Sequence, residues 1–103
     1  MRILMIIHIP VEQGNAVMKD GSWGPKFQSI LEDAKPESAY FAADNGERTA
    51  FLVVNIDDAS QIPALAEPWF LAFNARVQLH PCMSAEDLER AGPGMEAAVK
   101  KYA

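Results

Sequence analysis

The sequence predicts an α+β domain in which helices cover a four-stranded antiparallel sheet, with the element order βαββαβ. Three observations carry this prediction. Residues 2–9 form a short apolar run that is typical of a buried strand. Asn45-Gly46, the preferred two-residue hairpin turn, separates two extended runs. Residues 74–82 alternate polar and apolar side chains, as strands do, and the segments between these runs are helical in pattern.

Length and composition place the chain among small globular proteins. The 103 residues predict one domain over residues 1–103, and the apolar fraction of 50% is ordinary for a folded protein. Fourteen acidic residues against nine basic ones give a net charge of −5. Because nucleic acids and anionic membranes require a basic surface, we expect neither as a partner.

The cysteine content and the hydropathy of the sequence argue against a disulfide, a metal site and a membrane span. Cys82 is the single cysteine, so no disulfide can form within one chain, and no Cys/His cluster indicates a metal site. We therefore expect no metal and no cofactor. No stretch approaches the ~18 apolar residues of a membrane span, and the sequence favours a cytoplasmic protein.

The first half of the chain contains a strand, a broken helix and a hairpin. Residues 2–9 end before Pro10 and are followed by a helical segment at about 11–19. A second helix has Pro25 in its first turn, where proline is favoured, and ends near Lys35-Pro36. Pairing Asp44 with Glu47 across the turn predicts the hairpin register: Tyr40 opposite Phe51, Ala42 opposite Thr49, and Ala39 opposite Leu52.

The second half begins and ends with capped helices. Asp58 and Gln61 fit a capping box, and an apolar stripe follows at Ile62, Leu65, Ala66 and Trp69. We expect Pro68 to limit this helix to about two turns. Ser84 and Asp87 fit a second capping box, and Gly92-Pro93-Gly94 is expected to end that helix before a helical tail at Met95 to Tyr102.

This order is the split βαβ, or ferredoxin-like, arrangement. Four segments carry a resemblance to the dimeric α+β barrel superfamily, and especially to its small uncharacterised bacterial families: Ile3–Ile9, Asn45-Gly46, Glu67 to Phe70, and Val77 to Met83. The resemblance implies a homodimer formed through the sheet face and a small pocket between sheet and helices. The superfamily includes cofactor-independent monooxygenases and isomerase-like enzymes.

Two histidines are the clearest candidates for chemistry. In a ferredoxin-like sheet of order 4-1-3-2, His8 should neighbour Arg76 or Val77, whereas His80 should lie beside Leu4 or Ile3. The two imidazoles are therefore expected at opposite ends of the sheet, where they cannot share a metal. His8 is either a general base or hydrogen-bond donor at a pocket mouth, or a strand-end histidine bonded to a neighbour.

The last strand places four polar side chains on one face. Arg76, Gln78, His80 and Cys82 alternate with apolar residues, so we expect this face to meet solvent or a partner sheet. His80 and Cys82 suggest a Cys–His dyad, but same-face neighbours on a strand lie ~7 Å apart, which favours an inert cysteine.

Three aromatic residues are candidates for a ligand site. Trp23 lies in the break between the first two helices, where it is either a lid or a plug at the edge of the core. Trp69 is expected to pack beneath the sheet. Tyr40 either offers its hydroxyl to a ligand or forms a cross-strand pair with Phe51.

Two hypotheses of function follow. The first is a homodimeric domain that binds a small apolar or aromatic compound and performs cofactor-independent oxygenation or isomerisation, with His8 and Arg76 as catalytic residues and Trp23, Tyr40 and Trp69 in contact with the ligand. The alternative is a non-catalytic dimerisation or sensing module. A pocket of ~300 Å³ or more with two convergent polar groups would favour the first.

Overall fold

Four antiparallel strands form a sheet in the order β2-β3-β1-β4 in a computed structural model that describes residues 1–103. The elements, in chain order, are β1 (Arg2–Ile9), α1 (Val11–Lys19), α2 (Trp23–Ala34), β2 (Ser38–Asp44), β3 (Glu47–Asn55), the 3-10 turn η1 (Ala59–Gln61), α3 (Ile62–Phe73), β4 (Arg76–Pro81), α4 (Ala85–Arg90) and α5 (Gly92–Tyr102). This topology confirms the ferredoxin-like α+β fold. No helix is long and apolar enough to cross a membrane.

The predicted strand registers are confirmed. Asp44 pairs with Glu47 across the Asn45-Gly46 turn, and Tyr40 lies opposite Phe51. Both turn residues have positive φ, 51° at Asn45 and 75° at Gly46, which is why this dipeptide sets the hairpin. Between β1 and β4, His8 pairs with Arg76 and Leu4 with His80, as the strand order predicts.

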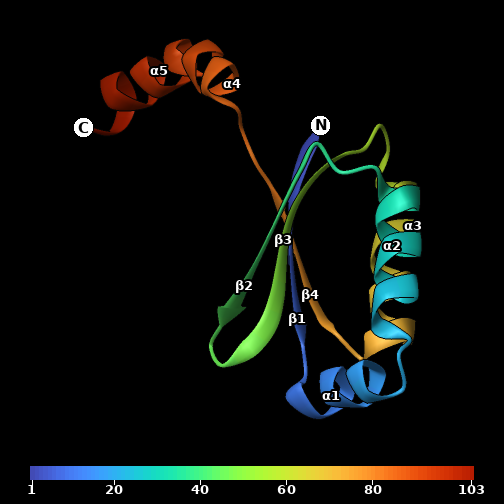
Figure 1. Cartoon of the computed structure of the whole chain (residues 1–103). Helices are drawn as coiled ribbons and strands as arrows, with labels where there is room; N and C mark the ends of the chain where they lie inside the picture. Colours follow the sequence, from blue (N-terminus) through green and yellow to red (C-terminus); the bar gives the residue numbers. More distant parts are fainter.

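Three helices cover one face of the sheet and leave the other uncovered. In Figure 1, α1, α2 and α3 lie on the same side, whereas α4 and α5 project away from the sheet. Side chains alternate between the two faces, so Met5 and Ile7 point toward the helices and Ile6 and His8 point to the open face. Every strand therefore has one covered and one open side.

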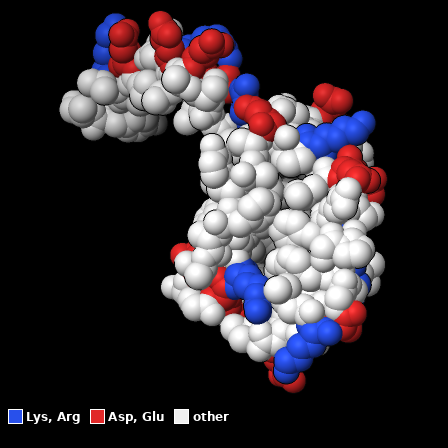
Figure 2. Space-filling model, viewed as in Figure 1, with Lys and Arg blue, Asp and Glu red and all other residues white.

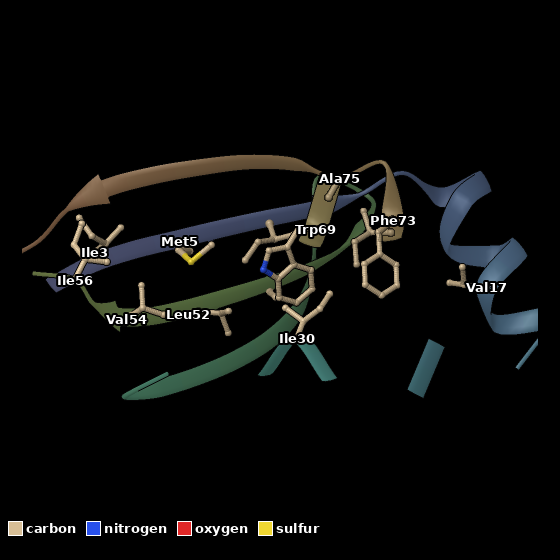
Figure 3. Packing of buried hydrophobic residues seen from close by; sticks show 13 residues of the cluster. Ile3, Met5, Val17, Ile30, Leu52, Val54, Ile56, Trp69, Phe73 and Ala75 are labelled. Atoms are coloured by element: carbon tan, nitrogen blue, oxygen red, sulfur yellow. The ribbon is translucent and has the colours of Figure 1, made fainter. Parts of the chain in front are cut away.

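The hydrophobic core lies between the sheet and the helices, as the close view in Figure 3 shows. Met5, Ile7 and Leu52 from the sheet are fully buried, as are Trp69 and Phe73 from α3. The expected place of Trp69 beneath the sheet is thus confirmed. Both capping boxes are also present, at Asp58 and at Ser84.

One prediction about α3 is wrong. Pro68 does not limit the helix to two turns, because α3 runs for 12 residues from Ile62 to Phe73 with Pro68 inside it. A proline in a helix interior costs ~3 kcal/mol through its missing N–H and its ring. Trp69 and Phe73 both follow it and are fully buried, and each such burial contributes roughly 1.5–3 kcal/mol. The burial of Trp69 and Phe73 therefore offsets the cost of Pro68. Helix propensity, which is a local property, does not include this burial.

Candidate functional site

A pocket opens between α2 and the hairpin end of β2 and β3. It has a volume of about 410 Å³, within the range of small-molecule sites. Seven of its nine lining residues are hydrophobic, and the full lining is Ile9, Trp23, Phe27, Phe41, Ala42, Ala43, Arg48, Thr49 and Ala50. The volume exceeds the ~300 Å³ expected of a ligand site. Two lining residues are polar, Arg48 and Thr49, but their side chains lie on opposite faces of the sheet, so the two do not converge on the pocket.

Aromatic rings form the wall of this pocket and link it to the core. The Phe27 ring stacks on Trp23 at 5.3 Å between centroids, and Phe41 meets it edge-on at the same distance. On its inner side, Phe27 contacts the buried Trp69 at 5.2 Å. Trp23 also packs edge-on against Phe73. Trp23 thus both closes the edge of the core and presents an aromatic side chain to the pocket, and packing on both sides holds these rings in place.

Arg48 brings a positive charge to the pocket. Its guanidinium carbon lies 5.8 Å from the centre of the Trp23 ring, and its Nη2 donates a hydrogen bond to Asn15 Oδ1 at 3.0 Å. No carboxylate lies within 4 Å of it, although Arg2, Arg76 and Arg90 each have one. A half-buried guanidinium with unused donors attracts a carboxylate or a similar planar anion.

Gly14 on α1 makes room for this guanidinium. A Cβ added at position 14 would lie 2.7 Å from Arg48 Nη1, which is closer than such atoms approach. Gly14 therefore lets the Arg48 side chain reach α1. The hydrogen bond from Arg48 to Asn15, the residue after Gly14, then holds the guanidinium over the Trp23 ring.

The residues predicted for the site do not come together within one chain. Trp23 lines the pocket, but Trp69 is part of the core and has no exposed surface. His8, Tyr40 and Arg76 lie on the open face of the sheet, because their positions alternate with those of the buried residues. The expectation that these three supply the polar groups of a pocket between sheet and helices is therefore not met.

On the open face, His8 and Arg76 are already paired with carboxylates. His8 Nε2 lies 2.9 Å from Asp44 Oδ2, and the His8 side chain is only 9% exposed. Arg76 Nη1 donates to Glu47 Oε2 at 3.3 Å, and its Nη2 contacts Oε1 of the same carboxylate. This geometry matches the interpretation of His8 as a strand-end histidine bonded to a neighbour. No group of three or more His, Cys, Asp or Glu side chains is arranged to hold a metal.

A second polar cluster lies at the opposite end of the open face. Arg2 Nε donates to both oxygens of Glu37, at 2.9 and 3.1 Å, and Asn55 Nδ2 donates to Oε1 at 3.2 Å. These hydrogen bonds, that from Arg2 first, hold the pKa of the Glu37 carboxyl below its ordinary value. Arg2 Nη1 also lies 3.7 Å from Asp87 at the start of α4.

Sequence reasoning missed Arg48, Phe27 and Phe41 as pocket residues. A signal for Arg48 was present in the predicted hairpin register, since it shares a face with Ala50 and Leu52 and is a charged residue among apolar ones. The two phenylalanines carry no such signal. The sequence pattern of a core-facing aromatic residue is the same whether its side chain borders a cavity or fills the core.

The comparisons with known proteins show the family of this chain. No curated protein has a sequence that matches this chain. Among solved structures, the chain is similar to the de novo designed protein Ferredog-Diesel, with a TM-score of 0.43, 7% sequence identity, and coverage of 78% of this chain and 83% of that chain. Residues 1–96 match the family described as "Domain of unknown function (DUF3303)", and the chain belongs to this family.

Proposed function

We propose that this chain binds a small apolar or aromatic molecule carrying an acidic group, in the pocket between α2 and the hairpin. The observation that carries the proposal is Arg48, a half-buried guanidinium without a carboxylate partner at the edge of an apolar pocket. The body of the ligand would lie against Trp23, Phe27 and Phe41, and its acidic group would meet Arg48.

A ligand carboxylate would compensate the positive charge of Arg48. A guanidinium that is partly removed from water loses hydration, and one hydrogen bond to a neutral amide replaces only part of it. A ligand carboxylate would supply the missing counter-charge where water screens it less than at the surface. The net charge of −5 means that the chain as a whole does not attract anions, so selectivity has to arise locally.

The same geometry favours binding over catalysis. Cofactor-independent oxygenation or isomerisation requires a base or acid in contact with the substrate. Arg48 and Thr49 are the polar lining residues, but Thr49 pairs with His8, so its hydroxyl lies on the open face, where it donates to the Glu47 carbonyl at 3.0 Å. His8 and Arg76 lie on the open face, on the other side of the sheet from the pocket. A role for these two as catalytic residues would require a ligand on the open face.

Homodimerisation through the open face is the second part of the proposal. Leu4, Ile6, Phe51 and Val53 form a half-exposed apolar strip there, and Tyr40 beside them is 72% exposed. Burying such a strip stabilises by roughly 25 cal/mol per Å² of apolar surface. A sheet face of this kind fits the same face of a second copy, because both carry the strip in the centre and paired charges at the ends.

The ligand proposal is tested by thermal shift with matched compounds. Benzoic acid, salicylic acid and phenylacetic acid are compared with their uncharged amides on the full chain, on Arg48→Gln and on Arg90→Gln. Arg90→Gln is the control, because it removes an exposed arginine far from the pocket. We expect the acids to raise Tm in the wild type and in the control, and Arg48→Gln to lose roughly tenfold or more in affinity, as expected for a charge-assisted hydrogen bond.

Two results would contradict the proposal. If none of the acids raises Tm, the pocket does not take this class of ligand. If acids and amides bind alike, or if Arg48→Gln binds the acids as tightly as the wild type does, the guanidinium is not the anion site.

A further inference from the structure

We propose that the C-terminal arm, residues Met83 to Tyr102, packs its apolar side against a second copy of this chain. The arm consists of α4 and α5 with the residues that lead into them. The inference rests on the homodimer proposed above and adds to it a second contact, supplied by the arm of each copy.

The arm has an apolar stripe with nothing packed on it. Met95, Val99 and Tyr102 follow one another at steps of four and three residues, which places them on one side of α5, and α4 adds the exposed Leu88. All four are at least half exposed, and so is Met83 at the base of the arm. The charged residues occupy the other side, and Figure 2 shows them along one edge of the arm with uncharged atoms below. Such a stripe is typical of a helix that packs against another surface.

The arm makes little contact with its own domain. No residue of α4 or α5 is buried. The chain measures 59 × 28 × 20 Å, and its radius of gyration is 17.1 Å, against ~13 Å for a compact domain of this length. Figure 1 shows the reason: the arm projects from the end of β4 instead of returning to the sheet.

The start of the arm is fixed in this direction. The Ser84 hydroxyl accepts from the Asp87 backbone N–H, and the Asp87 carboxylate accepts from the Ser84 N–H at 3.0 Å. The same carboxylate lies 3.7 Å from Arg2, and the Cys82 N–H donates to the Arg2 carbonyl. Folding back onto its own sheet would require the arm to give up the contact between Asp87 and Arg2, whereas the hydrogen bonds between Ser84 and Asp87 lie within the arm and would be kept.

The exposed area matches what a dimer needs. The chain exposes 6895 Å², whereas a compact monomer of this mass exposes ~5,700 Å² by the usual scaling. The excess of ~1,200 Å² exceeds the ~800 Å² that each partner contributes to a standard interface.

A second copy is the occupant that fits this area. The uncharged side of the arm turns toward the side of the molecule on which the sheet is open, so a copy seated on the open face would also meet the arm (Figures 1 and 2). In a dimer with two-fold symmetry, the open face and the arm of each copy would both be covered by the other copy.

The test compares two glutamate substitutions in the arm of the full chain. Val99→Glu places a charge in the stripe, and Ala97→Glu places the same charge on the opposite side of α5, where the residue is also exposed. Neither residue is buried, so both variants should keep the wild-type circular dichroism. We expect sedimentation equilibrium to show a dimer for the wild type and for Ala97→Glu, and a dimer weakened about tenfold or more for Val99→Glu.

The outcomes separate the arm from the sheet-face dimer. A wild type that is monomeric at ~100 μM, where a weak dimer still forms, overturns both proposals. A Val99→Glu variant that dimerises as tightly as the wild type overturns the arm contact and leaves the sheet-face dimer standing. Ile6→Glu tests that dimer separately, since Ile6 lies on the open face.

A photo-crosslinking amino acid at position 99 shows which chain the arm touches. In a mixture of tagged and untagged chains, packing on a second copy gives a product of two-chain mass that contains the tag and an untagged chain. Crosslinking only within one chain would show that the arm folds back onto its own sheet, and would overturn the inference.

Discussion

The two faces of the sheet differ in cover although the same strands form them. On the covered face, Met5, Ile7 and Leu52 have no exposed surface, because α3 packs Trp69 and Phe73 against them. On the open face, their neighbours Ile6 and Phe51 are equally apolar but half exposed. A strand that is apolar on both sides is expected to be covered on both faces, and the helices of one chain cover only one of them.

The faces also differ in how their charges are arranged. The open face carries its charged groups at its ends and in pairs, His8 with Asp44 and Arg76 with Glu47. The covered face carries one cation, Arg48, and no carboxylate beside it. Paired charges at the ends leave an apolar centre free for a flat partner, whereas an unpaired charge beside a pocket favours a ligand.

The largest expected effect comes from truncating neighbouring isoleucines on the two faces. Ile7→Ala removes a fully buried side chain and should lower the free energy of unfolding by roughly 2–5 kcal/mol. Ile6→Ala removes a half-exposed one and should cost less at low protein concentration, with a cost that grows with concentration if a second copy covers the open face. Urea denaturation at ~1 and ~100 μM protein measures both, since mass action makes a dimer's stability depend on concentration.

Two results would contradict the difference between the covered and the open face. Equal losses for Ile6→Ala and Ile7→Ala at low concentration would mean that the chain covers both faces by itself. A loss for Ile6→Ala that is the same at both concentrations would argue against a second copy on the open face.

A smaller effect is expected at Gly14, beside the guanidinium on the covered face. Gly14→Ala should hold or raise Tm, because alanine favours a helix over glycine by ~1 kcal/mol and only the flexible end of Arg48 has to move. This displacement of the Arg48 guanidinium should weaken the binding of the aromatic acids severalfold. A titration with each acid, followed by thermal shift, measures the change in affinity. Gly24→Ala in α2 is the matched control, since open space surrounds position 24. Unchanged acid binding in Gly14→Ala would show that the position of Arg48 does not govern affinity.

The smallest effect is expected at the end of the open face, where Arg2 lowers the pKa of Glu37. A carboxyl whose pKa is lower in the folded state stabilises the fold above its unfolded pKa, ~4.3, and loses that contribution as the pH falls through the folded value. Glu37→Gln should therefore lower Tm slightly at pH 7, and the difference should shrink on acidification. Glu96→Gln, which removes an exposed carboxylate with no ion-pair partner, should show no such trend. A difference in Tm that persists at low pH would assign the effect to packing.

Local sequence signals predicted the elements and their registers well. Asn45-Gly46 set the hairpin because its two positive φ angles suit few other dipeptides, and the capping residues Asp58 and Ser84 marked helix starts. The length of α3 was not predictable in this way. Pro68 is unfavourable locally, and only the burial of side chains beyond it keeps the helix intact.

The candidate site was less predictable than the fold. The strand order of a ferredoxin-like sheet predicted Arg76 or Val77 as the neighbour of His8, and His8 pairs with Arg76, but this order did not tell which face borders a pocket. The pocket depends on where the α2 rings stop filling the space above β2 and β3, which is a matter of packing between elements distant in sequence.

Periodicity and turn chemistry predicted the order of the elements, the hairpin register and the alternation of polar and apolar residues in the last strand, because these signals act over a few residues. Three features could be read only from the packed structure: which face the helices cover, the position of Arg48 beside Trp23 without a carboxylate, and the arm that projects from the domain. These features depend on contacts between segments far apart in the chain, and such contacts exist only once the sheet and helices have packed.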